Sequence, residues 1–251
     1  MILIVNADDL GTSERINQET FALMKSGIVT SATIIANAPA FESAAARVHD
    51  FPGCSFGVHL NLTAFPPAGP SSDLDSILDE NGHLSRKLLG APLSSRVRAA
   101  LLRELTIQVQ RVLDLGVSVS HFDSHQHVHT APRLFWVIKS LQRRFAIQKV
   151  RMTRNLFSPG KKIGKLHVLK KQAFGLALHN IYPTRSTEGF GEFRDFYATL
   201  AMGRIPRFQS LELMVHPGTS DPRYKEEVEL LRSDWRRILP TGAQFVSYHS
   251  I

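Results

Sequence analysis

Short apolar runs alternate with longer amphipathic runs along most of this 251-residue chain, and this alternation is what most restricts its fold. The short runs have the length and residue types of strands, whereas the longer runs place apolar residues at helical spacing. The expected strands cover residues 2–6, 29–36, 55–63, 117–123, 149–153, 211–216 and 244–248. The expected helices cover residues 13–26, 41–48, 97–115, 133–144 and 224–238, and residues 155–207 hold two more. Strands that alternate with helices predict a parallel sheet with helices outside it.

An open sheet and a closed barrel give the same alternation, so a second observation has to separate them. Conspicuous polar residues stand at the carboxyl ends of several expected strands, where barrel enzymes build their active sites. This favours an α/β fold with a distorted (β/α) barrel. A barrel of about 200–250 residues forms one domain, and we see no linker or internal repeat, so we expect a single catalytic domain over residues 1–251.

The distribution of charge restricts the class of partner. The net charge is +8, and no acidic residue lies between Asp123 and Glu188, where Lys and Arg recur. Such a stretch attracts phosphate, anionic lipid or nucleic acid, although a solvated basic surface is the simpler alternative. No nucleic-acid-binding motif accompanies it, so nucleic acid is not an expected partner. The amino terminus lacks the pattern of a signal peptide and no run is long enough to span a membrane, so we expect a cytoplasmic protein.

Two adjacent carboxylates, Asp8 and Asp9, stand at the end of the first expected strand. Adjacent carboxylates repel each other, and a metal ion or a shared proton relieves that repulsion. A helix cap before Gly11 is the alternative explanation of the pair.

His59 lies on the polar face of the third expected strand together with Asn61, because residues two apart on a strand point the same way. A single histidine on a strand is more often structural than a ligand. His59 therefore becomes a candidate ligand only together with other residues.

The densest signal is a group of four of the eleven histidines within nine residues: His121, His125, His127 and His129. Asp123 stands among them, and all five residues occupy odd positions. An extended chain would place all five on one side, and a helix would group residues 121, 125 and 129. Either arrangement concentrates imidazoles, which bind borderline metal ions at neutral pH.

One carboxylate and two histidines leave coordination positions for water and substrate, which is typical of a catalytic metal. Such a metal polarises a carbonyl and lowers the pKa of bound water towards about 7. Amide hydrolysis also needs a base for the water and an acid for the departing amine. Asp8 fits the base, and His216, which ends a late strand before Pro217-Gly218, fits the acid.

Five segments together resemble the YdjC-like carbohydrate deacetylase family. They are Asn-Ala-Asp-Asp-Leu-Gly at 6–11, Gly-Ile-Val-Thr-Ser-Ala at 27–32, Gly-Val-His-Leu-Asn-Leu-Thr at 57–63, Asp-Ser-His-Gln-His-Val-His at 123–129 and Met-Val-His-Pro-Gly at 214–218. The segments span residues 1 to about 218 in the family's order. The chain departs from the family pattern at Leu10, where Phe is commoner, and at Gln126, where His is common.

The resemblance implies a distorted (β/α) barrel similar to the polysaccharide-deacetylase (NodB-like) barrel. It also implies one divalent metal ion, Mg²⁺ or Zn²⁺, on Asp9, His59 and His125. Asp8 is then the general base and His216 the general acid.

Further residues are expected to bind substrate or to support the metal ligands. These are Asn61, Asp123, His127, His129, Arg151 and Arg154. For the two arginines a solvated basic turn is an equal alternative. No motif aligns over residues 155–207, which should contribute to substrate specificity.

The implied substrate is an N-acetylated amino sugar, either an oligosaccharide or a glycolipid. The basic stretch at 133–173 adds two weaker expectations: a lipid or phosphate group on the sugar, and peripheral membrane contact. A homodimer is also considered. The alternative functions are hydrolysis of another bond, such as a phosphoester, and non-catalytic binding of anionic glycans or lipids.

Overall fold

The computed structural model describes residues 1–151, 154–160 and 164–251. Its strands are β1 (Ile2–Leu10), β2 (Ser31–Ile34), β3 (Ser55–Leu60), β4 (Val119–Ser124), β5 (Gly189–Glu192), β6 (Ser210–Val215) and β7 (Gln244–Phe245). Its α-helices are α1 (Glu14–Lys25), α2 (Phe41–Ala46), α3 (Ser95–Asp114), α4 (Phe135–Phe145), α5 (Lys165–Ile181), α6 (Phe193–Ala201) and α7 (Pro222–Arg232). Short 3₁₀ segments join them, and the turn at His125–Thr130 is interrupted by a kink at Gln126 and His127.

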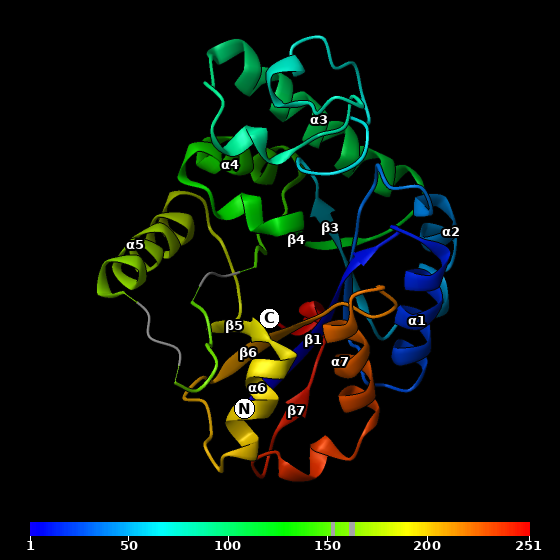
Figure 1. Ribbon diagram of the computed structural model, residues 1–251, viewed down its shortest axis with the longest axis vertical. Coiled ribbons are helices and arrows are strands. Elements are labelled where there is room, and N and C mark those ends of the chain that lie inside the picture. The colour runs from blue at the N-terminus through cyan, green and yellow to red at the C-terminus, as the bar shows by residue number, and fades with distance from the viewer. Residues whose placement is uncertain (152–153, 161–163) are drawn as a thin grey trace.

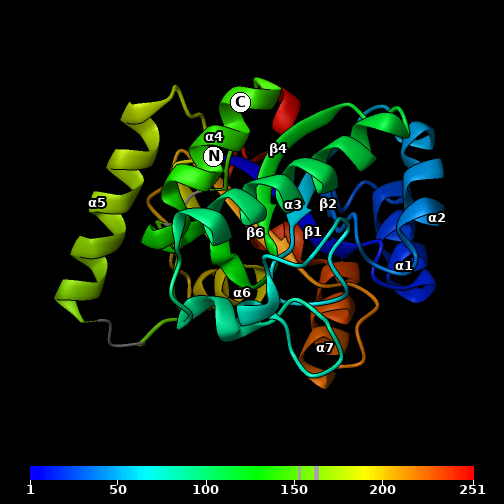
Figure 2. The ribbon, with the colours of Figure 1, turned by 90° about the horizontal axis from the view of Figure 1, so that it is seen from above.

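The strands form one parallel sheet in the order β4-β3-β2-β1-β6-β5, and β7 also pairs with β1. Figures 1 and 2 show the helices outside this curled sheet, with α1 and α2 on one flank and α5 on the opposite flank. Because helices cover the sheet, its central strand can be apolar on both faces. Leu3, Ile4 and Val5 of β1 are accordingly fully buried.

The segment after α4 lies against both outer strands of the sheet. Val150 pairs in parallel with Phe122 of β4, and Asn155 pairs in parallel with Phe190 of β5. The sheet therefore curls towards closure through single bridges instead of a full strand. This arrangement confirms the predicted α/β fold with a distorted barrel.

Most expected elements lie within a few residues of the observed ones. Residues 155–207 contain α5 and α6, as expected, but also β5, which the sequence pattern does not predict. The expected strand at 149–153 is reduced to isolated bridges at Lys149 and Val150. Its residues 152–153 lie outside the described residues, and so do Lys161 and Lys162 of the acid-free stretch.

Parallel strands direct their carboxyl ends to the same rim of the sheet, and this rim carries the polar clusters. Asp8 and Asp9 are near the end of β1, His59 is near the end of β3, His125 follows β4 and His216 follows β6. Among the helices of the described chain, none combines the length and apolar character that crossing a membrane would require.

Candidate metal centre and active site

The structure brings Asp9, His59 and His125 together from three separate strand ends. Asp9 Oδ1 lies 2.8 Å from His125 Nδ1 and 3.3 Å from His59 Nε2. One ligand atom from each residue lies within 4.8 Å of the other two. Two imidazoles and one carboxylate match the three-ligand pattern of a catalytic metal site.

The surroundings of His59 fit a metal ligand. Asp123 Oδ1 lies 2.7 Å from His59 Nδ1, and the other ring nitrogen, Nε2, faces Asp9. A carboxylate on the far nitrogen fixes the orientation of a ligand histidine and increases its basicity. Burial lowers the pKa of His59, but the charges of Asp123 and Asp8 outweigh burial and raise it to about 10. A metal ion at Nε2 therefore competes with a proton.

The backbone of β1 is irregular where it presents its two carboxylates. Asp9 has a φ of 65°, and the pairing of β1 with β2 shifts register between Ala7 and Leu10. Neighbours on a regular strand would point to opposite faces, whereas here Asp8 and Asp9 line the same cavity. Burial raises the pKa of Asp9, but hydrogen bonds with the two histidines hold it well below its ordinary value. Asp9 is therefore ionised and suited to bind a cation.

The loop that follows β4 is also held in an unusual backbone conformation. Gln126 and His127 have φ values of 52° and 56°, in a region that non-glycine residues rarely occupy. The His127 ring packs edge-on against Phe190, with 5.4 Å between ring centroids. Ser124 Oγ accepts the backbone N–H of His129 at 2.9 Å. These contacts hold a conformation that costs about 1–3 kcal/mol per residue.

Asp8 is held by Arg151, whose side chain is fully buried. Arg151 Nη1 donates to Asp8 Oδ2 at 2.7 Å, and Nη2 donates to Oδ1 at 2.6 Å. Asn6 Nδ2 also donates to Oδ1, at 2.9 Å. Burial raises the pKa of Asp8, but the charge and hydrogen bonds of Arg151 hold it far below its ordinary value. The Asp8 carboxylate is therefore ionised and fixed in direction.

Arg151 connects Asp8 to two further buried carboxylates. Its Nε donates to Glu212 Oε1 at 2.8 Å, and its Nη2 lies 2.8 Å from Asp123 Oδ2. Asp8, His59 and Asp123 form a second group with the spacing of metal ligands. Arg151 binds both carboxylates of that group, and Asp123 also binds His59 Nδ1. We therefore interpret the group as an ion-pair network in which Arg151 holds the two carboxylates and Asp123 holds the His59 ring of the candidate metal site.

His216 reaches the same cavity from the end of β6. Its backbone N–H donates to Glu227 Oε2 at 2.8 Å, and its ring packs on Tyr224 with 4.3 Å between centroids. His216 Nδ1 is buried and has no hydrogen-bond partner among the described residues. The ring is therefore held by stacking and by its backbone, and no described carboxylate pairs with Nδ1.

The three expected metal ligands and both predicted catalytic residues line one cavity of about 310 Å³. The residues that complete its lining are Gln126, His127, Glu192, Met214, Thr219 and Tyr224. A cavity of this size is within the range of about 300–1,000 Å³ that small ligands occupy.

Other predicted site residues lie outside this cavity. The side chain of Asn61 bonds within the turn at 61–64 and to a neighbouring asparagine. Arg154 is exposed and pairs with Glu188 at 2.8 Å. Arg151, expected to bind substrate or to support the metal ligands, is fully buried and is surrounded by three carboxylates. His129 is buried beside the cavity, with its ring Nδ1 2.6 Å from a serine hydroxyl.

Several cations of the acid-free stretch have structural roles. Lys139 is almost fully buried and donates to Thr184 Oγ1 at 2.7 Å and to a backbone carbonyl of α5. Lys149 donates to a backbone carbonyl near the carboxyl end of the chain. Arg143 and Arg144 are exposed. The predicted basic surface is therefore smaller than the sequence indicates.

Four residues that contact the site were not predicted: Thr33, Glu212, Glu227 and Tyr248. Thr33 Oγ1 donates to Asp123 Oδ2 at 3.0 Å, and Tyr248 Oη donates to Glu212 Oε2 at 2.5 Å. Glu212 does give a sequence signal, because it is a single carboxylate within the apolar run of a strand. The other three give no comparable local signal.

Comparison with known proteins agrees with the motif pattern. A carbohydrate deacetylase of Brevibacillus brevis is 34% identical over 248 residues, which are 98% of this chain and 91% of that protein. A carbohydrate deacetylase of Geobacillus stearothermophilus is 39% identical over 153 residues, which are 60% of each chain. One from Vibrio cholerae is 28% identical over 88% of this chain and 80% of its own length.

A solved structure shows the same fold. A protein of Enterococcus faecalis V583, named as a candidate cellobiose-phosphate cleavage protein, aligns with 99% of this chain and 98% of its own. The TM-score is 0.76 at 22% sequence identity. The sequence profile of the family described as YdjC-like protein matches residues 2–239. This match covers nearly the whole chain and confirms the resemblance indicated by the motifs, so the chain belongs to the YdjC-like protein family.

Proposed function

We propose that this chain is a metal-dependent deacetylase that hydrolyses the N-acetyl group of an amino sugar to a free amine and acetate. The observation that carries the proposal is that three side chains spaced as metal ligands, a further carboxylate and a further histidine line one cavity. The relatives named carbohydrate deacetylase support the reaction class.

The protein's own residues divide the proton transfers between them. Asp8, kept ionised and directed by Arg151, accepts the proton of the attacking water. His216 donates a proton to the departing nitrogen, which leaves as an amine. Asp9, His59 and His125 would hold a divalent metal ion, which would polarise the acetyl carbonyl. Water is consumed, the C–N bond breaks, and acetate and the free amine are the products.

The ligand set favours Zn²⁺ over Mg²⁺ as the metal. Zn²⁺ accepts imidazole and carboxylate ligands in a site of three protein ligands. Mg²⁺ prefers oxygen ligands in octahedral geometry and retains several waters. Measuring the metal content of the purified protein distinguishes the two ions.

A second metal ion, as many phosphoesterases require, has less support. Such sites place two ions about 3.5–4 Å apart and need additional carboxylates. The second group of the described residues with suitable spacing has its carboxylates bound by Arg151. We therefore favour amide hydrolysis over phosphoester hydrolysis.

The expectations about location, oligomeric state, membrane contact and the group attached to the sugar stay predictions. They are a cytoplasmic location, a homodimer, peripheral membrane contact through residues 133–173, and a lipid or phosphate group on the sugar. The exposed pair Arg143 and Arg144 is consistent with anionic partners.

Acetate release from a panel of N-acetylated mono-, oligo- and lipid-linked sugars tests the proposed function. Asp8→Asn should abolish acetate release while the protein retains its metal, because Asp8 is not one of the three proposed ligands and its carboxylate is bound by Arg151. Asp50→Asn changes an exposed carboxylate and serves as the matched control. Full activity of a metal-loaded Asp8→Asn protein would contradict the proposed mechanism.

A further inference from the structure

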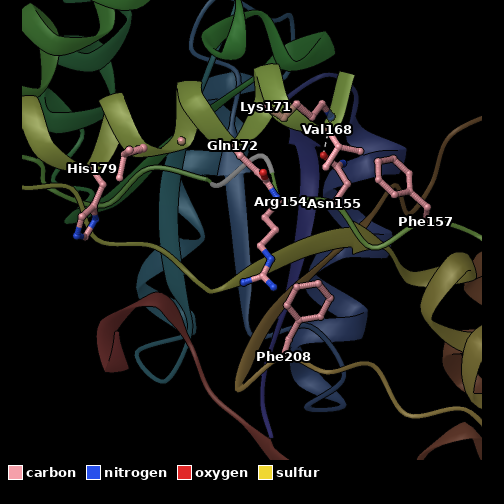
Figure 3. Close-up of a pocket in the computed structure, with 10 residues that line it drawn as sticks. Arg154, Asn155, Phe157, Val168, Lys171, Gln172, His179 and Phe208 are labelled. Atoms are coloured by element: carbon pink, nitrogen blue, oxygen red, sulfur yellow. Dashed lines mark hydrogen bonds between the residues drawn. The ribbon is translucent and has the colours of Figure 1, made fainter. Parts of the chain in front are cut away.

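A second and larger cavity lies beneath α5, outside the metal site. Its volume is about 590 Å³, and Phe157, Val168, Leu176 and Phe208 give it an apolar lining. Gly175 of α5 lines it without a side chain. Figure 3 shows side chains of α5 on one side of this space, with Arg154, Asn155 and Phe157 across from them and Phe208 at the far end. The cavity has the size and composition of a site for a small apolar group.

A narrow space of about 40 Å³ lies between this cavity and the metal site and shares lining residues with both. His127 lines both the narrow space and the catalytic cavity. Asn155 and Lys171 line both the narrow space and the apolar cavity. The three spaces therefore adjoin one another, from the metal ligands outwards to α5.

The polarity of the lining changes along this line. The narrow space is polar, because His127, Thr130, Asn155 and Lys171 contribute to its lining. Lys171 Nζ donates to Asn155 Oδ1 at 2.6 Å, and this bond joins α5 to the residue that pairs with Phe190 of β5. No carboxylate lines the narrow space or the apolar cavity within the described residues. From the metal site outwards, the lining therefore changes from the polar catalytic cavity, through the polar narrow space (the polar neck), to the apolar cavity beneath α5.

We propose that the cavity beneath α5 is a second subsite of the same active site and binds an apolar hydrocarbon group attached to the sugar. The substrate is then an amphiphile, with its N-acetyl group beside Asp9 and its linking atoms in the polar neck. This inference rests on the proposed deacetylase function. Residues 155–207 would then contribute to substrate specificity because α5 contacts the hydrocarbon group attached to the sugar.

Alkyl glycosides of N-acetylglucosamine with methyl, octyl and dodecyl groups test the proposal below their micelle concentrations. The wild-type protein should show a kcat/KM for acetate release that rises with chain length through a lower KM. The rise is up to about fourfold for each methylene that the cavity buries.

Two leucines of α5 provide a matched pair of variants. Leu176 lines the cavity and is 66% exposed, whereas Leu166 is 65% exposed and lies outside it. Because both side chains are largely exposed, arginine should be tolerated at either position. Leu176→Arg should lower the dodecyl-to-methyl ratio of kcat/KM at least tenfold, and Leu166→Arg should keep the wild-type ratio.

Each other outcome has a definite meaning. Equal kcat/KM for the three glycosides in the wild-type protein would overturn the subsite. Equal loss of the ratio in both variants would also overturn it, because a general surface effect of α5, such as membrane contact, would then explain the preference. If no glycoside releases acetate, the proposed function fails, and calorimetric binding still tests the cavity: affinity for the dodecyl glycoside no higher than for the methyl glycoside would overturn it.

Discussion

Arg151 binds both carboxylate oxygens of Asp8, at 2.7 and 2.6 Å, and binds Glu212 through Nε at 2.8 Å. The proposed general base is therefore attached to the interior of the barrel through one guanidinium. The planar fork of arginine is required for this pairing, since an ammonium group makes a single-point contact. The position of Asp8 in the cavity thus depends on a residue that does not itself line that cavity.

Replacing Arg151 with lysine should weaken both catalysis and stability. The variant cannot bind Asp8 and Glu212 together, so we expect kcat to fall about 100-fold through misplacement of Asp8. The free energy of unfolding should fall by about 2–4 kcal/mol, because a buried carboxylate loses its partner. Arg111→Lys changes a partly exposed arginine that pairs with the exposed Glu42 and should alter stability by less than about 1 kcal/mol. Wild-type kcat in a folded Arg151→Lys protein would refute this role.

Replacing Asp123 with asparagine should reduce metal affinity. Asp123 orients His59 through the 2.7 Å contact with Nδ1, and loss of such a partner lowers affinity by about 10–100-fold. Calorimetric titration with Zn²⁺ measures the change, and circular dichroism checks the fold. Asp114→Asn, at an exposed position of α3, is the control. Unchanged affinity would show that Asp123 serves the ion-pair network alone.

The buried carboxyl of Glu227 should make stability depend on pH. Burial, reinforced by nearby Glu192, raises its pKa from 4.5 to about 8, although the His216 N–H donor lowers it. The folded protein therefore binds a proton more tightly than the unfolded chain. This contribution is fully present below pH 4.5 and is lost as the pH rises to about 8.

Glu227→Gln removes this titration. Between pH 4.5 and pH 8.5 the wild-type protein should lose about 4 kcal/mol of unfolding free energy relative to Glu227→Gln. Urea unfolding of both proteins at several pH values measures the difference. Parallel stability curves for the two proteins would contradict the raised pKa.

Gly57 should not tolerate a side chain. A Cβ at this position would lie 2.6 Å from the ring of His121 and 2.7 Å from its backbone oxygen. The backbone atom cannot move aside cheaply, so Gly57→Ala should destabilise the protein by about 1–3 kcal/mol. Gly53→Ala, where a Cβ would meet nothing within 4 Å, is the matched control in a thermal unfolding assay. Equal melting temperatures of the two variants would refute the prediction.

Much of the fold was predictable because its signals are local. The spacing of apolar residues locates most helices and strands, and parallel pairing then places the polar strand ends on one rim. Strand β5 escaped prediction because Gly189 and Gly191 are poor strand formers. The structure explains both glycines: a Cβ would lie 2.7 Å from the Phe208 ring at Gly189 and 2.9 Å from Leu156 Cβ at Gly191. Such approaches join segments far apart in sequence, so no local pattern reports them.

Some residues of the candidate site could be predicted from local sequence signals, whereas others are placed by long-range packing. His125 was found from a dense local cluster, and Asp9 and His59 from the family motifs. The sequence places Arg151 near a strand end but does not give the direction of its side chain. Its burial against carboxylates depends on β1, β4 and β6 meeting in space. Glu212 and Tyr248 join the network through the same long-range packing.

The left-handed backbone at Asp9, Gln126 and His127 has a consequence for engineering heat tolerance. Strain of this kind persists where the surrounding structure enforces it, and relief of strain raises stability. Selection for higher melting temperature alone would therefore favour glycine or asparagine at Gln126. Each such gain would relax the loop that carries His125 and His127, so thermal tolerance and turnover would change in opposite directions.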